Sequence, residues 1–202
     1  MSFGRASYHH GHLREALLEV ARRLIVERGL GGFSFAELAR AAGVSPAAPY
    51  RHFRDRNAVV GEIARIGFEQ LEQDLRVAWN HGLPDHASAI ERCGRTYLAF
   101  ARRDPAAYAA MFDTTPGEAD PAVRRASDGA YAVVRMAADA ICATAPGRPP
   151  ASMVALHIWS MCHGIANLYV GTASPGRRSL PMSAEDLLDA GLMVYLRSVW
   201  MD

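Results

Sequence analysis

The chain has 202 residues, of which 50% are hydrophobic and 21% are charged, and its formal net charge is +1. This balance excludes disordered and fibrous classes and fits one or two globular domains. All 22 basic residues are arginine, and they are unevenly placed: residues 1–56 contain nine arginines and five acids, whereas the remainder contains 13 arginines and 16 acids. A basic N-terminal region favours a module that faces nucleic acid.

Two helices are predicted between residues 13 and 42. Apolar residues recur at helical spacing from Leu13 to Ile25, and Gly29 is a natural C-terminal cap. Ser34 and Glu37 then form a Ser-x-x-Glu capping box, which is typical of the start of a helix. We therefore expect a first helix that ends near Gly29 and a short second helix that begins after Ser34.

A third short helix and a long connecting helix are predicted next. Gly43 supplies a turn, and Ser45 followed by Pro46 predicts a helix that runs to about residue 53. Asp55 predicts the start of a long helix that continues to about residue 77. Two short helices joined by a tight turn form a helix-turn-helix, whose second helix can lie in the major groove of DNA.

The rest of the chain has a helical pattern, and no segment has the pattern of a strand. Breaks at residues 104–105, 114–121, 146–150 and 171–182 divide it into about five helices, the last opened by Ser183. The predicted fold is thus all-α, with about nine helices in total. We expect a three-helix DNA-binding domain at residues 1–56 and a helical ligand-binding and dimerisation domain at residues 57–202.

Residues 151–176 carry no formally charged side chain, which raises the possibility of a membrane span. His157, Ser160, His163 and Asn167 interrupt this segment, so we expect a buried helix and no membrane association. The first 11 residues are polar and short, so no signal peptide is expected. The three cysteines are odd in number and lie in apolar helical stretches, which argues against a disulfide framework and favours the cytoplasm.

Residues 34–59, SFAELARAAGVSPAAPYRHFRDRNAV, resemble the signature of the TetR family of transcriptional regulators. The resemblance extends over residues 8–62. It is weaker at residues 159–164, where WSMCHG is similar to a Trp-His-Gly class of TetR ligand domains. It implies a homodimeric regulator that binds a palindromic operator in double-stranded DNA, a repressor that is released by a small hydrophobic or aromatic effector.

The same resemblance implies a set of DNA-contacting residues. Phosphate contacts are implied for Ser34, Tyr50 and Arg56, and groove contacts for the start of the third helix and for Arg51 or His52. Arg56 lies in the first turn of the connecting helix, where backbone N–H groups favour phosphate, and an arginine such as Arg51 can bind guanine through two hydrogen bonds. The full set is Arg5, Ser34, Ser45, Pro46, Ala47, Ala48, Tyr50, Arg51, His52 and Arg56. Packing for Tyr50 and simple solvation for Arg51 remain the alternatives.

Three residues depart from the family pattern in this region. Ala48 stands where the family often has Thr, and Asn57 replaces a common acid. Pro49 stands where the family usually has Leu or Ile, which removes a backbone donor and can kink the third helix. Recognition of the base sequence would then depend on apolar contacts with thymine methyl groups and on few side chains.

Large aromatic and sulfur-containing side chains predict an effector pocket in the second domain, with core packing as the alternative for each of them. The candidates are Phe68, Tyr97, Phe100, Tyr108, Met111, Phe112, Tyr131, Trp159 and His163. Trp159 and His163 are four residues apart on one helical face, and we expect His163 to orient the ligand. The alternative for this pair is the dimer seam, which the resemblance assigns to the last two helices. The expected seam residues are Asn167, Val170, Leu187, Leu188, Gly191, Val194 and Tyr195.

Other functions find little support in the sequence. His9, His10 and His12 have no cysteine or carboxylate beside them to complete a site, so we expect no metal and no other cofactor. We find no Gly-x-Ser-x-Gly elbow, phosphate loop or paired catalytic carboxylates, which argues against an enzyme. The remaining alternative is a protein-interaction module on the same scaffold without specific DNA binding.

Overall fold

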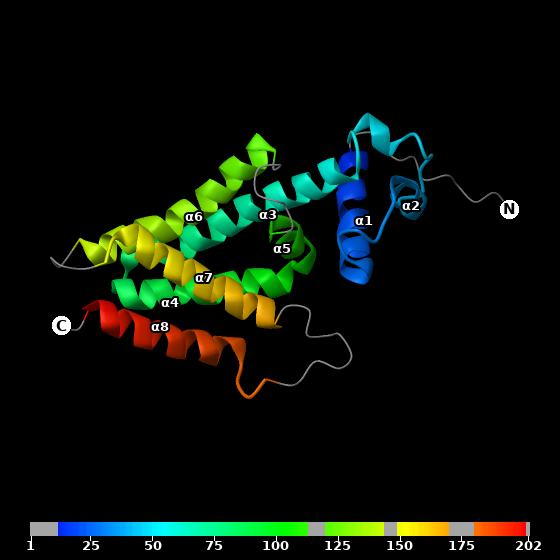
Figure 1. Cartoon of the computed structure of the whole chain (residues 1–202). Helices are drawn as coiled ribbons and strands as arrows, with labels where there is room; N and C mark the ends of the chain where they lie inside the picture. The colour runs from blue at the N-terminus through cyan, green and yellow to red at the C-terminus, as the bar shows by residue number, and fades with distance from the viewer. Residues whose placement is uncertain (1–11, 113–119, 144–148, 170–179, 201–202) are drawn as a thin grey trace.

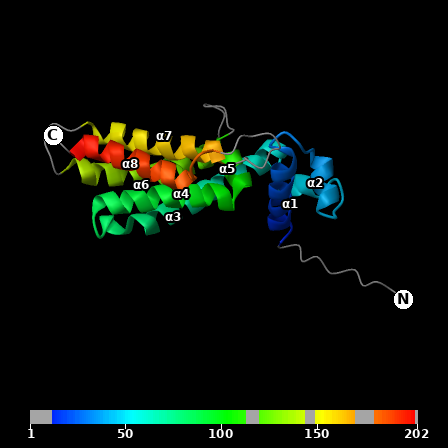
Figure 2. The same cartoon turned by 90° about the horizontal axis from the view of Figure 1, so that it is seen from below.

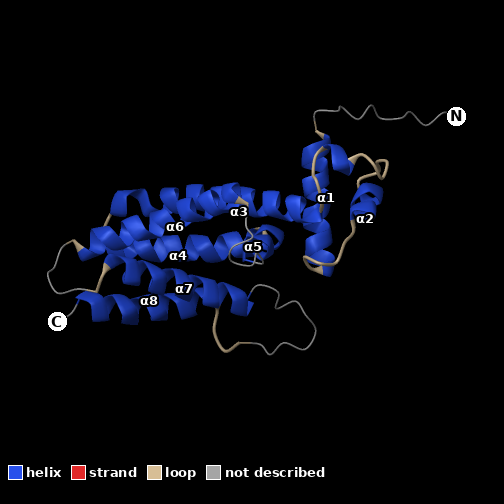
Figure 3. Cartoon of the chain, turned by 45° about the horizontal axis from the view of Figure 1, so that its top comes forward, coloured by secondary structure: helices blue, strands red, loops and turns tan. Residues whose placement is uncertain are grey.

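The computed structural model describes residues 12–112, 120–143, 149–169 and 180–200, and every regular element within these ranges is helical (Figure 3). The prediction of an all-α fold is confirmed. Eight α-helices and two 3-10 turns are present in this part of the chain, where the sequence predicted about nine helices. They are α1 (Leu13–Arg28), α2 (Phe35–Ala41), η1 (Pro49–Arg51), α3 (Arg56–Trp79), η2 (Asn80–Gly82), α4 (His86–Arg103), α5 (Pro105–Phe112), α6 (Pro121–Cys142), α7 (Ala151–Tyr169) and α8 (Ala184–Trp200).

The N-terminal elements α1, α2 and η1 form a small unit at one end of the molecule, and α3 leads from it into a bundle (Figure 1). The unit has its own apolar centre, in which Leu17, Leu38 and Phe53 are buried. Local signals set its helix boundaries. The side chain of Ser34 accepts a hydrogen bond from the Glu37 N–H, the Glu37 carboxylate accepts one from the Ser34 N–H, and this capping box begins α2 as predicted.

The long helix α3 forms the spine of the bundle. Asp55 begins it, because its Oδ1 accepts a hydrogen bond from the Ala58 N–H at 2.8 Å. Helices α4, α5 and α6 pack against α3, while α7 and α8 lie on α4 and α6 or on each other (Figure 2). Gly67 permits a close approach of α3 to α5, since a Cβ there would lie 2.8 Å from Met111 Sδ and 3.0 Å from Ala107 Cβ.

The predicted helix breaks agree with the described boundaries. Helix α4 ends directly before Asp104, and α5 begins at Pro105. The last helix is capped at Ser183, whose Oγ accepts a hydrogen bond from the Asp186 N–H at 3.0 Å. The charge-free segment contributes α7, which buries Val154 and Ile158 against the bundle. Within the residues that the structure describes, no helix is long and apolar enough to cross a membrane.

Candidate nucleic-acid interface and ligand site

The predicted third helix is much shorter than expected, and the expectation that it runs from Pro46 to about residue 53 was wrong. Residues 46–48 form turns, and only Pro49–Arg51 is a short 3-10 helix. An α-helix begun at Ser45 requires the N–H of residue 49 as a donor to the Ser45 carbonyl, and a proline at that position has none. The chain instead closes tighter turns: Ala48 N–H donates to Ser45 O at 2.9 Å and His52 N–H donates to Pro49 O at 3.0 Å. Pro49 itself is buried.

These turns leave an exposed segment beside α2. Ser45, Pro46 and Ala47 are exposed, whereas Ala48 is half-buried. Tyr50 is 63% exposed and packs only one edge against Phe35, with ring centroids 4.8 Å apart. Most of this side chain is therefore accessible to an external partner, which counts against a packing role alone.

The arginines of this region differ in what they contact. Arg51 is exposed and has no ion pair within the described residues. Arg54 is paired with Asp55 at 2.9 Å. Arg56 is the first residue of α3, is half-buried, and makes one long hydrogen bond, of 3.4 Å, to Asn57 Oδ1. Two uncompensated guanidinium groups thus flank the exposed turn, where they can bind phosphate or base edges.

Ser34, His52 and Arg5 are the other predicted DNA contacts. The Ser34 hydroxyl is already used: it donates to Glu37 Oε2 at 2.9 Å while it accepts from the Glu37 N–H. The hydrogen bond from the Ser34 backbone N–H is the main cause that holds the pKa of Glu37 below its ordinary value. His52 is half-buried beside Arg51, and Arg5 lies outside the described residues.

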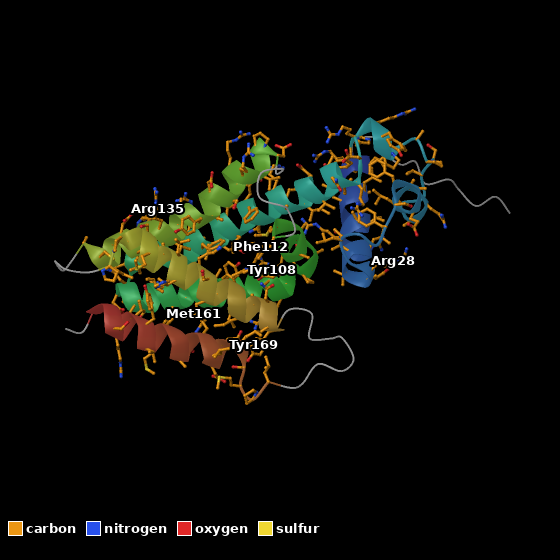
Figure 4. All side chains as sticks on the ribbon, in the orientation of Figure 1. Arg28, Tyr108, Phe112, Arg135, Met161 and Tyr169 are labelled. Atoms are coloured by element: carbon orange, nitrogen blue, oxygen red, sulfur yellow. The ribbon has the colours of Figure 1, made fainter. Side chains whose placement is uncertain are left out.

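A cluster of aromatic and polar side chains forms between α4, α5 and α7, and we call Tyr97, Tyr108, Phe112 and His163 the His163 cluster. Tyr108 and Phe112 project from α5 toward α7 (Figure 4). The His163 Nδ1 lies 3.2 Å from the Tyr97 hydroxyl and 3.0 Å from the Tyr108 hydroxyl. The Phe112 and His163 ring centroids are 4.2 Å apart, and Asn167 Nδ2 lies 2.9 Å from His163 Nε2.

The His163 cluster is electrically neutral. Burial lowers the pKa of His163 from its ordinary value, so the imidazole is uncharged at neutral pH. Burial also raises the pKa of Tyr108 to about 12, and the pKa of Tyr97 is raised for the same reason. The cluster therefore offers hydrogen-bond donors and acceptors without a net charge.

A small apolar cavity adjoins this cluster. It has a volume of about 20 Å³, which is enough for one water molecule. Tyr97 belongs to the cluster and also lines the cavity, where its ring packs edge to face against Trp159 with centroids 5.2 Å apart. Of the residues that line the cavity, only Tyr97 and Trp159 were predicted from the sequence; Cys93 and Cys162 are among those that were not, because an apolar helical stretch does not show which of its positions face a void. Burial raises the pKa of each thiol to about 12, so both are protonated at neutral pH.

The other predicted ligand residues divide into two groups. Phe68 and Tyr131 lie at the edges of the site, since Phe68 contacts Phe112 at 5.8 Å and Tyr131 contacts Trp159 at 5.8 Å between ring centroids. Phe100 and Met111 do not line the cavity or belong to the His163 cluster. Phe100 is 1% exposed and Met111 packs against Gly67, which favours the core-packing alternative for both.

The predicted seam residues differ in how deeply they are buried within the protomer. Leu188 is fully buried inside the protomer, where its side chain occupies the space beside Gly94, so its assignment to a dimer seam was wrong. Met161 covers Gly191, and Leu187 is half-buried. The Tyr195 hydroxyl lies 3.0 Å from His157 Nδ1. Asn167 and Val194 are exposed, and Val170 lies outside the described residues.

Helix α7 exposes an apolar face that the sequence analysis did not single out. Met153, Leu156 and Leu168 are each about half exposed, and a Cβ at Gly164 would meet open space. Trp159 points away from this face and contacts Tyr97, which favours the pocket over the seam for the Trp159–His163 pair. The helical period of α7 thus separates an inward ligand side from an outward apolar side.

No group of three or more His, Cys, Asp or Glu side chains is arranged to hold a metal ion in the part of the chain that the structure describes. His157 and His163 contact different neighbours, Tyr195 and Tyr108. Of the N-terminal histidines, His9 and His10 lie outside the described residues.

Comparison with known proteins gives two family matches. Residues 17–63 match the model of bacterial regulatory proteins of the tetR family, and residues 90–194 match the model of the tetracyclin repressor-like C-terminal domain. The HTH-type transcriptional regulator AcrR of Shigella flexneri is 42% identical over 68 residues. That alignment covers 31% of this chain and 32% of AcrR, so the chain matches about a third of that regulator's length.

Solved structures share the whole architecture. A protein of unknown function from Rhodococcus sp. RHA1 is 30% identical, with a TM-score of 0.79 over 96% of this chain and 99% of its own. AibR, solved in complex with isovaleryl coenzyme A and operator DNA, has a TM-score of 0.69 at 19% identity, over 90% of this chain and 97% of its own. At that identity the likeness to AibR shows the fold alone.

Proposed function

Because the chain belongs to the TetR family of bacterial regulatory proteins, we propose that it is a transcriptional repressor that binds a palindromic operator as a homodimer and is released by a small effector. The exposed turn at residues 45–51, with Tyr50 and Arg51 at the surface and Arg56 beside it, carries this proposal. We propose a domain boundary between residues 56 and 57, at the start of α3. We also propose that the protein acts in the cytoplasm.

We assign base readout to the exposed turn and phosphate binding to its flanks. Ser45, Pro46 and Ala47 present small groups that can approach thymine methyls, and Arg51 has the donors for a guanine. Tyr50 and Arg56 would position the turn on the backbone. Because Pro49 replaces a helix with a 3-10 turn, fewer side chains reach the groove than in a full recognition helix, which favours a short base-specific contact.

The outward face of α7 and the exposed side of α8 are proposed as the dimer seam. Leu156 is 53% exposed and Val194 is 67% exposed, and an apolar face of this kind is suited to an isologous contact. Gly164 would let the backbones of two α7 helices approach closely, since nothing lies over it. A dimer would place two DNA-binding units on half-sites about 34–36 Å apart.

The effector that fits the His163 cluster is a small uncharged molecule with one hydrogen-bonding group and an apolar body. His163 and the hydroxyls of Tyr97 and Tyr108 can bind the polar group, and the neighbouring cavity can receive the apolar part. The cavity holds about 20 Å³ in this structure, so the effector must displace side chains to enter. AibR supports the general scheme, because it was solved with both a ligand and operator DNA.

Helix α5 provides a route from the effector to DNA. Tyr108 and Phe112 on α5 contact His163, whereas Asp104, directly before α5, is paired with Arg22 of α1. A ligand that moves α5 would therefore move α1 with it. A coupling free energy of about 1–3 kcal/mol would weaken operator binding roughly 5- to 150-fold.

The test is binding of the full chain to DNA fragments that tile the region around its gene, at two salt concentrations. We expect one fragment to bind tightly as a dimer. Arg51→Ala should weaken that complex by about 1–3 kcal/mol and relax one base preference, and Arg56→Ala should weaken all fragments and reduce the salt slope by about one.

Arg135→Ala is the matched control, because Arg135 is exposed on α6 at the end of the bundle away from α1 and α2 (Figure 4). It should bind DNA like the wild-type chain. Weak, uniform binding by the wild-type chain, or equal losses in all three variants, would contradict specific operator binding and favour a protein-interaction module.

A further inference from the structure

A polar hollow lies where the N-terminal unit meets the bundle, between α1, α3 and the junction of α4 with α5. Two adjoining hollows, of about 520 Å³ and 400 Å³, share Arg22, Arg103 and Asp104 in their walls. We call the smaller, inner one the junction hollow, and its walls are completed by Ile66, Gly67, Gln70 and Phe100. It lies apart from the His163 cluster, with which it has no residue in common.

Two guanidinium groups face this hollow with donors to spare. Arg22 is paired with Asp104, and Arg103 Nη2 donates to Asp74 Oδ2 at 2.6 Å. Each arginine has five N–H donors, and no other hydrogen bond from either side chain to a described residue is present. Each therefore retains N–H donors for a further acceptor.

The floor of the junction hollow is apolar. The Arg103 guanidinium carbon lies 5.7 Å from the centre of the Phe100 ring, and Ile66 and Gly67 continue this floor along α3. Two guanidinium groups and one carboxylate, that of Asp104, face the hollow, because Asp74, the partner of Arg103, is not among the wall residues. The acids Glu19 and Glu27 line the outer hollow and not the junction hollow. An anion with an apolar body matches this combination.

Asp104 has a separate role for each of its carboxylate oxygens. Oδ1 accepts a hydrogen bond from the Ala107 N–H at 2.9 Å and so caps α5, while Oδ2 accepts one from Arg22. A competing carboxylate could take Arg22 from Oδ2 and leave the α5 cap in place. Within the described residues, the Arg22–Asp104 ion pair is the one that joins α1 to the α4–α5 junction.

We infer that the junction hollow binds a small carboxylate with an apolar body, such as an aromatic acid, between Arg22 and Arg103, and that this ligand competes with Asp104 for Arg22. Carboxylates bind guanidinium groups through two parallel hydrogen bonds, which gives the site its selectivity for this head group. Occupation loosens the link between α1 and α5. The hollow is thus a second regulatory site, distinct in charge from the neutral His163 cluster.

The experiment is calorimetric titration of the full chain with benzoate and with benzamide, which has a similar shape and no charge. Benzoate should bind and benzamide should bind at least about tenfold more weakly, because the charge-assisted hydrogen bonds are lost. Arg103→Gln should weaken benzoate binding at least about tenfold. Arg102→Gln is the matched control, since Arg102 is the preceding residue but pairs with Glu185 on α8.

Two further variants locate the ligand. Asp104→Asn removes the competing charge while an amide can still cap α5, so benzoate should bind more tightly. Phe112→Ala alters the His163 cluster and should leave benzoate binding unchanged. The inference is overturned if benzoate gives no saturable binding, if benzamide binds equally well, if Arg102→Gln matches Arg103→Gln, if Asp104→Asn weakens binding, or if Phe112→Ala abolishes it. None of these results depends on whether the chain binds DNA.

Discussion

Replacing Gly67 with alanine tests how tightly α5 is held against α3. The new Cβ would lie 2.8 Å from Met111 Sδ and 3.0 Å from Ala107 Cβ, whereas carbon atoms pack best at about 3.5–4.0 Å. The Met111 side chain is 3% exposed and has little room to move, and the Ala107 Cβ is fixed to the α5 backbone. The variant must therefore push α5 outward.

Gly61→Ala in the same helix is the control for this prediction. Its Cβ would meet Val123 Cγ2 at 3.9 Å, which is an ordinary contact. Both variants gain helix propensity, by up to about 1 kcal/mol, so this gain cancels in the comparison. The difference between them isolates the overpacking at α5, and we expect Gly67→Ala to be less stable than Gly61→Ala by about 1–3 kcal/mol.

Urea unfolding followed by far-UV circular dichroism measures this difference, at one fixed protomer concentration because dimerisation shifts the apparent stability. A thermal melt should show the same order, with about 2–4 °C for each kcal/mol. A Gly67→Ala variant as stable as Gly61→Ala would refute the reasoning, because it would mean that α5 moves away from α3 at no cost.

Two further predictions concern the start of α3 and the α7 face. Asp55→Ala should lower the free energy of unfolding by about 1 kcal/mol, whereas Asp55→Asn should retain the cap. The hydrogen bond from Ala58 lowers the pKa of Asp55, so the stability that its charge contributes is present above the ordinary carboxyl pKa. Urea titrations should show that it is lost as the pH falls through the lowered value. Leu156→Glu should convert a dimer to monomers in light scattering, while Val77→Glu, at a position 80% exposed on α3, should not.

The helices that the sequence predicted correctly are those with local signals at their ends. The capping box at Ser34, the cap at Asp55 and the break before Pro105 each act within a few residues, and each marks a helix end in the structure. Pro49 is a local signal too. The Ser45–Pro46 start signal predicted a helix to about residue 53, whereas the missing N–H of Pro49 leaves an α-helix begun at Ser45 without a bond.

The ligand site and the seam were harder to predict, because both depend on which helices meet. The sequence identifies Tyr97 and His163 as candidates but does not show that residues 66 positions apart share a hydrogen bond. Helix α8 has apolar residues on more than one side, and periodicity does not show that Leu188 packs within the protomer while Val194 remains exposed. Tertiary packing makes these choices.

The position of α5 sets how the two proposed ligand sites would act together. Tyr108 and Phe112 link it to the His163 cluster, Asp104 links it to α1, and Gly67 fixes it against α3. An effector shifts a conformational equilibrium only by the difference between its affinities for the two states. Both sites act on this one helix. Once a neutral ligand has moved α5, an anion at Arg22 can therefore shift the position of α5 by less than it would alone. Their effects on operator affinity should therefore be less than additive, as expected for perturbations that share one element.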